Sequence, residues 1–366
     1  MKTSYPSKRA KRLFSGLDPK IDAVLIVNSR LPFLDDNFRY LTDAMGGVFE
    51  GSVAIATARG VTVITSPMEV EIARASGCRT IPTSDRKEFD VALRKALKGR
   101  ETIGVNMSGI THSSMKQVKK IIKGARFKDV SKQLNAARMI KGQEEISRIK
   151  KACGIASKVA EEIPQIVSTG MTEKEAGAEI DHLLRNHGAD GSSFETIVAF
   201  GTATAVPHHR PDDTKLRKGS IALFDFGATY KNYRSDITRT YFTKPLRTDL
   251  AGIHQIVLKA QNAAIDLVKP GVKARKIDFA ARKIIADAGY GDRFIHSTGH
   301  GLGLSEHDPG AIAEKSKDVL RENMVFTVEP GVYIPGKGGV RIEDDILVDK
   351  TSGRILTKAE RGIVLL

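Results

Sequence analysis

The stretch that decides the fold is Ile221-Ala-Leu-Phe-Asp-Phe-Gly-Ala-Thr-Tyr-Lys-Asn-Tyr-Arg-Ser-Asp-Ile-Thr-Arg-Thr-Tyr241. Two runs rich in aromatic and β-branched residues flank a polar turn near Tyr230-Lys231, which predicts an antiparallel hairpin. A hairpin centred there would place Asp225 directly opposite Asp236. Two facing carboxylates repel each other, and a buried carboxylate either raises its pKa or takes a cation as its partner. The stretch therefore predicts a charged site on a buried sheet.

A second stretch, residues 325–345, repeats this arrangement. Its glycine-rich turn is centred on Gly336, so this hairpin would set Glu329 across from Glu343. Between the two hairpins lies His300, with a glycine on either side. Glycines remove bulk and let the imidazole approach a neighbour closely. The sequence thus predicts four carboxylates and one histidine in a single site.

This set of side chains is typical of a metal centre. Four negative charges are balanced by two divalent cations, and carboxylate-rich ligation favours Mn, Co or Fe in the +2 state, or Zn, over copper. A pair of such ions generates a bridging hydroxide and polarises a carbonyl, so hydrolysis is the expected reaction. Each motif alone also fits a hydrogen-bonded strand-end acid or a loop histidine. Their occurrence together in one part of the chain favours the metal centre.

Length and texture predict two domains. The 366 residues exceed the ~250–300 at which one hydrophobic core stops growing. Strand-like runs alternate with helical patterns in the first third, which indicates an α/β domain; the strands are expected at 23–27, 52–56, 61–65 and 102–106, the helices at 68–76, 86–98 and 113–123. The remainder mixes four longer helices with strands, which indicates an α+β domain; the helices are expected at 143–167, 172–188, 249–268 and 274–288, the strands at 194–200, 220–226, 235–242, 324–333 and 340–348. We place the boundary between residues 135 and 136.

Charge gives a weaker indication of function. Lys and Arg number 58 against 43 Asp and Glu, a net +15 at pH 7, which by itself favours nucleic-acid binding. Residues 1–140 hold 25 basic and 13 acidic side chains, or +12, while residues 141–366 hold 33 and 30, or +3. The excess lies outside the part with the carboxylates and is typical of a solvated surface. We therefore expect no nucleic-acid partner, and a non-catalytic module that binds peptide or nucleic acid is the competing hypothesis.

The cysteine count and the apolar runs bear on the compartment. Cys78 and Cys153 are the only cysteines, too few for a disulfide framework or a thiolate zinc site. No apolar run approaches the ~20 residues of a membrane span, and the run at 23–27 is too short for the core of a signal peptide. These features favour a cytoplasmic protein with no membrane partner.

Taken in order, the motifs resemble those of the pita-bread metallopeptidases, the family of Xaa-Pro dipeptidase (prolidase), aminopeptidase P, methionine aminopeptidase and creatinase. They are Asp225-Phe-Gly, Ser235-Asp-Ile-Thr-Arg-Thr240, Gly299-His-Gly-Leu-Gly303, Val328-Glu-Pro-Gly-Val-Tyr333 and Val340-Arg-Ile-Glu-Asp344. The resemblance covers nearly the whole chain. It implies a creatinase-like α/β N-terminal domain, residues 1–135, and an α+β pita-bread catalytic domain, residues 136–366, whose halves are related by a pseudo-two-fold axis.

The resemblance also implies roles for the acids and His300. Asp225 would bind one metal ion, Asp236 and Glu343 would bridge two ions, and His300 and Glu329 would bind the other. Glu329 would also shuttle the proton to the leaving imino nitrogen. Mn or Co is favoured among the possible metals.

Two more histidines and an arginine match the family. His208 falls near the expected position of the scissile bond, although the adjacent His209 is an alternative. His307 would donate a hydrogen bond to the substrate carbonyl or the tetrahedral intermediate. Arg341 would pair with the site carboxylates or with the substrate.

Within the family, the retained acids and the N-terminal domain leave two activities. Both cleave the bond between any residue and proline in a proline-containing peptide, and they differ in whether anything follows the proline. The short chain favours the Xaa-Pro dipeptidase, with Xaa-Pro aminopeptidase (aminopeptidase P) as the alternative. The resemblance further implies a homodimer.

Overall fold

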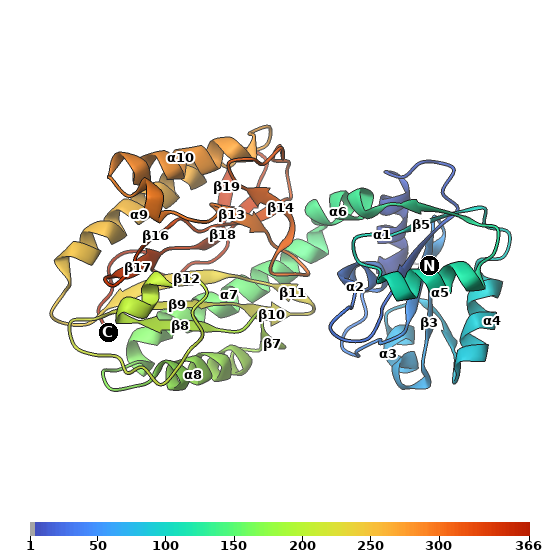
Figure 1. The fold of residues 1–366 in the computed structure, drawn as a ribbon, viewed down its shortest axis with the longest axis horizontal. Helices are drawn as coiled ribbons and strands as arrows, with labels where there is room; N and C mark the ends of the chain where they lie inside the picture. The colour runs from blue at the N-terminus through green and yellow to red at the C-terminus, as the bar shows by residue number, and fades with distance from the viewer. Residues whose placement is uncertain (1–3) are drawn as a thin grey trace. The chain divides into compact units, whose positions relative to one another are not determined.

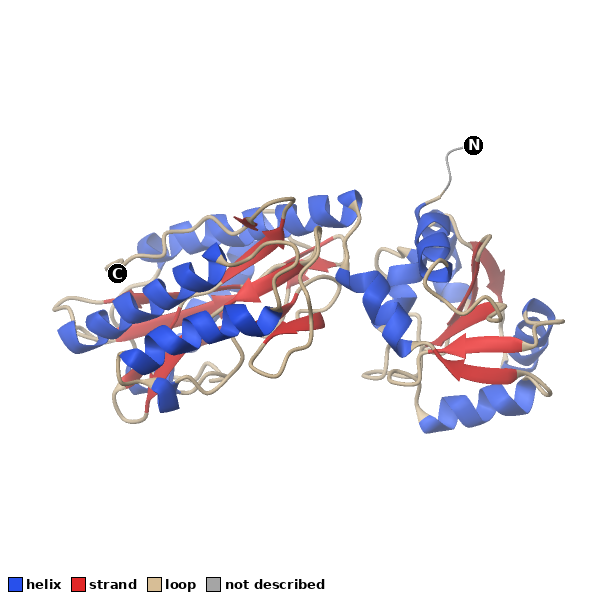
Figure 2. Cartoon of the chain, turned by 90° about the horizontal axis from the view of Figure 1, so that it is seen from above, coloured by secondary structure: helices blue, strands red, loops and turns tan. Residues whose placement is uncertain are grey.

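The computed structural model describes residues 4–366, which form two compact units that divide between Arg138 and Met139. The sequence-based boundary between residues 135 and 136 falls inside the helix that ends the first unit, α6 (Ser131–Met139). Each unit has its own buried apolar clusters, in which strands pack against helices. Figure 2 shows helices bordering the strands of both units. The predicted fold class, α/β followed by α+β, is confirmed.

The first unit is built on a mixed six-stranded sheet in the order β4-β3-β2-β1-β5-β6. Its strands are β1 (Ala23–Val27), β2 (Val53–Thr57), β3 (Gly60–Thr65), β4 (Arg79–Pro82), β5 (Thr102–Val105) and β6 (Arg126–Asp129). Its helices before α6 are α1 (Tyr5–Phe14), α2 (Asp36–Thr42), η1 (Pro67–Glu69), α3 (Val70–Ala75), α4 (Arg86–Ala96) and α5 (His112–Ile121). The edge strands β4 and β6 were not expected from the sequence, because each has a single large aliphatic or aromatic side chain, Ile81 and Phe127, and lacks the apolar pattern of the central strands.

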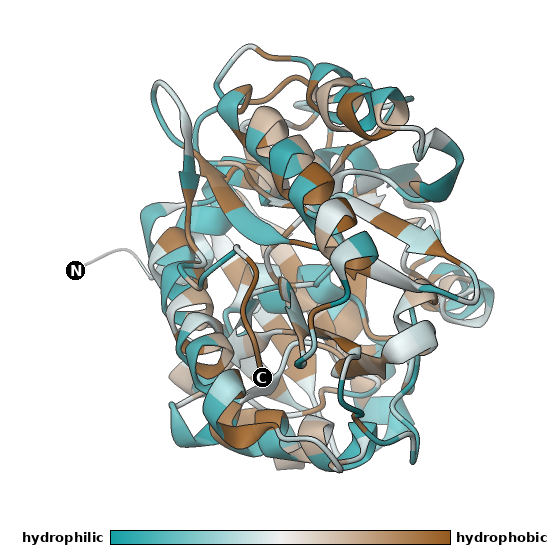
Figure 3. Ribbon diagram, turned by 90° about the vertical axis from the view of Figure 1, so that its left-hand side faces the viewer, coloured by the Kyte–Doolittle hydropathy of each residue, from teal (hydrophilic) through white to brown (hydrophobic). Residues whose placement is uncertain are grey.

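Two pairs of helices enclose the strands of the second unit. They are α7 (Gln143–Ile166) with α8 (Glu173–Asn186), and α9 (Thr248–Asp266) with α10 (Ala274–Asp287). Figure 1 shows the two pairs on opposite sides of the strands. Their surfaces alternate hydrophilic and hydrophobic residues (Figure 3), as expected of helices that bury one face. The capping box predicted at the start of α8 is present, since Thr172 N–H donates to Glu175 Oε2 at 2.8 Å and Glu175 N–H to Thr172 Oγ1 at 3.1 Å.

The strands of the second unit form several small antiparallel sheets. The two that carry most of the long strands run β12-β9-β8 and β14-β13-β15-β18-β19. Their strands, with those of the smaller sheets and two short helices, are β7 (Gly191–Ser192), β8 (Ile197–Phe200), η2 (Gly201–Ala205), β9 (Ile221–Phe226), β10 (Ala228–Tyr230), β11 (Tyr233–Arg234), β12 (Ile237–Phe242), η3 (Gly291–Arg293), β13 (Gly299–Gly301), β14 (Asp308–Ile312), β15 (Val325–Val328), β16 (Gly331–Ile334), β17 (Gly338–Arg341), β18 (Asp344–Val348) and β19 (Gly353–Ile355). The runs expected at 324–333 and 340–348 are each divided into two strands.

The register of the first hairpin differs from the sequence-based prediction. Asp225 on β9 pairs with Thr238 on β12, so Asp236 lies two positions from the residue opposite Asp225. The cause is the turn, which is centred on Lys231 and Asn232 instead of Tyr230 and Lys231. Both residues have positive φ, 47° and 68°, the conformation of a two-residue type I′ hairpin turn.

The register of the second hairpin is as predicted. The pairs Gly331 with Arg341 in β16–β17 and Val328 with Asp344 in β15–β18 are both symmetric about Gly336. Glu329 and Glu343 therefore face each other in the gap between two ladders. Their backbone N–H groups bond elsewhere, to Thr298 O at 2.8 Å and Thr238 O at 3.2 Å. Because the ladder is interrupted between these pairs, Glu329 and Glu343 lie outside the regular sheet and can both contribute to one site.

Both cysteines are buried, one in each unit. Cys78 lies in the first unit and Cys153 on α7 in the second. Among residues 4–366 no helix combines the length and the apolar character that crossing a membrane requires.

Candidate metal centre and active site

The acids of the two hairpins line one cleft. Its volume is about 870 Å³, and it contains all eight residues that the sequence singled out: His208, Asp225, Asp236, His300, His307, Glu329, Arg341 and Glu343. They come from β9, β13 and β17 and from the breaks between strands. The two hairpins and the segment between them thus converge on a single site.

Three of the predicted ligands are close enough to share an ion. One ligand atom from each of Asp236, His300 and Glu343 lies within 4.8 Å of the others. His300 Nε2 is 3.7 Å from Asp236 Oδ2 and 3.3 Å from Glu329 Oε1. Asp225 lines the same cleft, and its charge acts on Asp236, Glu329 and Glu343.

The electrostatics of the cleft call for positive charge. Burial, and then the charges of neighbouring acids, raise the pKa of Asp236 and Glu343 well above their usual values. Burial likewise raises the pKa of Glu329 to about 7, with a further contribution from Asp225. Like charges cannot all ionise at such a site without a cation.

The donor set fits divalent metal ions. Asp225 Oδ1 and Asp236 Oδ1 are buried and accept no hydrogen bond from any of residues 4–366. An unpartnered buried carboxylate oxygen is costly, and an ion that it coordinates removes that cost. Burial lowers the pKa of His300, which favours the neutral imidazole that binds metals. Four carboxylates with one imidazole suit Mn, Co, Fe or Zn.

Two threonines orient the acids. Thr238 Oγ1 donates to Glu343 Oε2 at 2.6 Å. Thr327 Oγ1 donates to Glu329 Oε1 at 3.1 Å and accepts from His300 N–H at 3.1 Å. Such outer partners fix the direction of a ligand's lone pairs.

Arg341 is buried beside the carboxylates, as the sequence suggested. Its guanidinium donates to Asp225 Oδ2 at 2.5 Å and to Thr238 Oγ1 at 3.0 Å. It also donates to Tyr333 Oη at 2.8 Å, and Tyr333 lies 2.8 Å from His296 Nε2. A chain of polar contacts therefore runs from the cleft wall to Asp225.

The sequence analysis did not single out His296 or Tyr333 as site residues. His296 lines the cleft, and burial lowers its pKa to about 4, so it is neutral at physiological pH. Tyr333 lies on β16, four residues after Glu329, and ends the motif Val328-Glu-Pro-Gly-Val-Tyr333. That motif was the available signal, but it pointed to Glu329 as the functional residue.

The remaining histidines differ in their surroundings. The rings of His300 and His307 have centroids 4.3 Å apart, which places the exposed His307 at the site. His209 also lines the cleft, but its Nε2 lies 2.7 Å from Glu173 Oε2. His208 is exposed at the cleft, and the structure records no hydrogen bond from its ring to any described residue. Of the adjacent pair, His208 is therefore the more exposed and His209 the one bound to a carboxylate.

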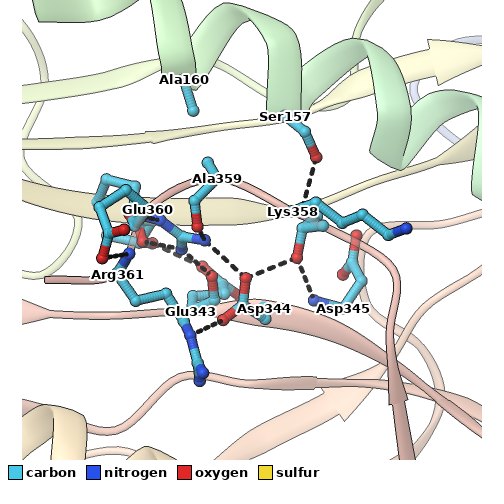
Figure 4. Close-up of polar contacts among 12 residues, drawn as sticks. Ser157, Ala160, Glu343, Asp344, Asp345, Lys358, Ala359, Glu360 and Arg361 are labelled. Atoms are coloured by element: carbon cyan, nitrogen blue, oxygen red, sulfur yellow. Dashed lines mark hydrogen bonds and ion pairs between the residues drawn. The ribbon is translucent and has the colours of Figure 1, made fainter.

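A second layer of polar contacts holds the strand that carries Glu343 (Figure 4). Asp344 is fully buried, and its Oδ1 accepts from Arg239 at 2.7 Å and from Thr357 Oγ1 at 2.7 Å. Asp345 Oδ2 accepts from the N–H of Asp236 at 2.9 Å. Asp344 and Asp345 therefore support the backbone of the site, whereas Glu343 before them lines the cleft.

Comparison with known proteins places both units. Residues 147–350 match the model of metallopeptidase family M24, and residues 9–140 match the creatinase/prolidase N-terminal domain. The chain is 36% identical to the Xaa-Pro dipeptidase of Pyrococcus horikoshii over 359 residues, which are 98% of this chain and 99% of that protein.

Solved structures agree with these matches. An Xaa-Pro dipeptidase from Bacillus anthracis is 34% identical, covers 99% of this chain and all of its own, and superposes with a TM-score of 0.91. An X-Pro aminopeptidase from Thermotoga maritima is 33% identical, with 98% and 99% covered and a TM-score of 0.90. The hairpins of acids, the cleft that they line and these full-length likenesses make the chain a member of metallopeptidase family M24 with a creatinase/prolidase N-terminal domain.

Proposed function

We propose that the protein is an Xaa-Pro dipeptidase that uses two divalent metal ions. The observation that carries the proposal is the single cleft lined by Asp225, Asp236, His300, Glu329 and Glu343, in a chain whose full length resembles named Xaa-Pro dipeptidases. These five residues would hold the ions, with Asp236 and Glu343 shared between them. Bound divalent ions supply water activation and polarisation of the scissile carbonyl.

The chain's own residues would complete the chemistry. Glu329 would take the proton from the attacking water and pass it to the leaving imino nitrogen of proline. His208 and His307 would donate hydrogen bonds to the carbonyl oxygen as negative charge develops there. Arg341, bonded to Asp225, would fix that carboxylate and offset part of the negative charge of the site.

The alternative is an Xaa-Pro aminopeptidase, favoured by the likeness to the Thermotoga maritima enzyme. The two activities differ in the chain that follows proline. Leu-Pro and Leu-Pro-Xaa peptides assayed side by side with added Mn or Co separate them. The dipeptidase cleaves Leu-Pro alone, and excess chelator abolishes cleavage. Cleavage restricted to the longer peptide would contradict the proposal and establish the aminopeptidase.

Two further properties belong to the same proposal. Mn or Co is expected to give the highest rate, and metal analysis of the purified protein measures the identity of the ions and their number per chain. A homodimer is expected, and light scattering of the metal-loaded protein measures its mass.

A further inference from the structure

The loop of residues 206–212 carries His208 into the cleft. It follows η2, whose Thr204 Oγ1 accepts from Gly339 N–H at 2.7 Å, so the start of the loop is fixed against β17. The loop itself holds alternating exposed and half-buried residues, and His208 is among the exposed ones. Its position therefore depends on what holds the far end of the loop.

The far end of the loop is held by Glu173. This residue opens α8 and is completely buried. Its Oε1 accepts from Phe200 N–H at 2.7 Å, and its Oε2 accepts from Asp212 N–H at 3.0 Å. His209 Nε2, in the middle of the loop, lies 2.7 Å from the same Oε2. One carboxylate thus ties β8 and two points of the loop to a helix.

Glu173 is not needed to cap its helix. Thr172 and Glu175 already form the capping box at this end of α8. A buried carboxylate is unfavourable unless hydrogen bonds compensate for the lost water. All the donors to the Glu173 carboxylate come from β8 and the loop 206–212. The carboxylate therefore fixes the positions of β8 and the loop relative to α8.

The cluster of Glu173, His209 and Asp212 also has the spacing of a metal site, because one ligand atom from each lies within 4.8 Å of the others. Its hydrogen bonds argue against that use. Both oxygens of Glu173 already accept donors, and Oε2 accepts two. The Glu173–His209 contact is a direct pair, unlike the unpartnered oxygens of Asp225 and Asp236 in the cleft.

We propose that Glu173 and His209 form a positioning pair that fixes the loop 206–212 and thereby sets the His208 imidazole in the cleft. The inference rests on the proposed function, in which His208 acts on the substrate carbonyl. Pre-ordering the loop matters because a donor misplaced by about 1 Å can cost about a hundredfold in rate.

A double-mutant cycle on Leu-Pro hydrolysis tests the pair. His209→Ala is expected to lower kcat about tenfold to a hundredfold, with a smaller change in KM and unchanged bound metal. In a His208→Ala background, the same substitution is expected to have no further effect, since the pair acts through His208. His209→Gln, whose amide can still donate to Glu173, should recover most of the rate. If the fold-decreases in kcat of the two single variants multiply in the double variant, the proposal is overturned, because His209 would then act independently of His208 through a general structural role.

The matched control is another histidine–glutamate pair, which also involves α8. His187 Nε2 lies 2.8 Å from Glu162 Oε1, joining the end of α8 to α7, and neither residue lines the cleft. His187→Ala is expected to leave kcat unchanged. If His209→Ala does not fold, His209→Asn, whose shorter amide does not reach Glu173, replaces it in the cycle.

The two proposals fail differently. A wild-type rate in His208→Ala would overturn the role of His208 in the proposed function. A slow His208→Ala enzyme together with a wild-type rate in His209→Ala would overturn only the positioning pair.

Discussion

At the scale of single residues, the cleft is defined by acids that cannot remain charged together. Asp236 and Glu343 are 6% and 1% exposed, and the pKa of each is raised by burial and by the other acids. The sequence predicted these acids, because each follows or precedes an apolar run in which a carboxylate is out of place. The family resemblance implied that Arg341 would pair with the site carboxylates or the substrate, and it does bond to Asp225, but its second bond, to Tyr333, was not predicted. The bond to Asp225 depends on the approach of strands far apart in sequence.

Neutralising one shared acid should remove the metal. We expect Glu343→Gln and Asp236→Asn each to lower both bound metal and Leu-Pro hydrolysis more than a hundredfold, beyond the ~10–100-fold cost of losing an outer partner. Metal analysis and kcat/KM measure the two effects. The matched control is Glu322→Gln, an exposed acid before β15. Intact activity in either site variant would refute the ligand assignment.

At the scale of elements, the two hairpins show what a sequence can and cannot specify. Apolar runs located most strands and all four long helices of the second unit, because buried faces impose periodicity. The Gly336 turn gave the second register correctly. The predicted register of the first hairpin was wrong because Lys231 and Asn232 both adopt positive φ. A lysine rarely has positive φ, so the sequence did not indicate a turn at this position. The edge strands β4 and β6 were not predicted, because largely exposed strands lack the apolar pattern by which strands are recognised in a sequence.

The observed turn predicts how substitutions act on stability. Replacing Lys231→Asn together with Asn232→Gly supplies the pair preferred in type I′ turns and should raise the free energy of unfolding by about 1 kcal/mol. Lys231→Val should lower it by a similar amount, because a β-branched residue is strained at positive φ. Urea unfolding of the metal-loaded protein measures both. If the turn were centred one residue earlier, glycine at position 232 would lie in a strand and destabilise the protein.

At the scale of the whole molecule, metal and protons compete for the same acids. An acid whose pKa is higher in the folded than in the unfolded protein binds more protons when folded. Its contribution therefore destabilises the fold as pH rises from its unfolded pKa, about 4.3 for a glutamate, through its folded value. Glu329, with a pKa of about 7, acts in this direction, and so do Asp236 and Glu343, whose pKa values are raised well above their usual range.

The stability gained from metal should therefore grow with pH. Between pH 5 and pH 8, we expect the difference in melting temperature between Mn-loaded and chelator-treated protein to widen, with up to about 1.4 kcal/mol per pH unit for each proton involved. His254, whose pKa burial lowers to about 4, affects both forms equally and cancels in the difference. A constant difference across this range would contradict the linkage.

Each unit has one buried cysteine, whose rate of reaction with a thiol reagent can measure how often that unit opens. Cys78 and Cys153 are both buried, and burial raises the pKa of Cys78 to about 11 and that of Cys153 well above its usual value. A thiol reagent reacts with the thiolate and must first reach it, so neither side chain reacts until its surroundings open. Because Cys153 Sγ lies 3.2 Å from Asp345, the acid that supports the backbone of Asp236, its labelling rate reports the opening of the metal centre itself. The labelling rate of Cys78 reports the opening of the first unit independently. One labelling experiment on the whole protein can therefore follow the opening of both units.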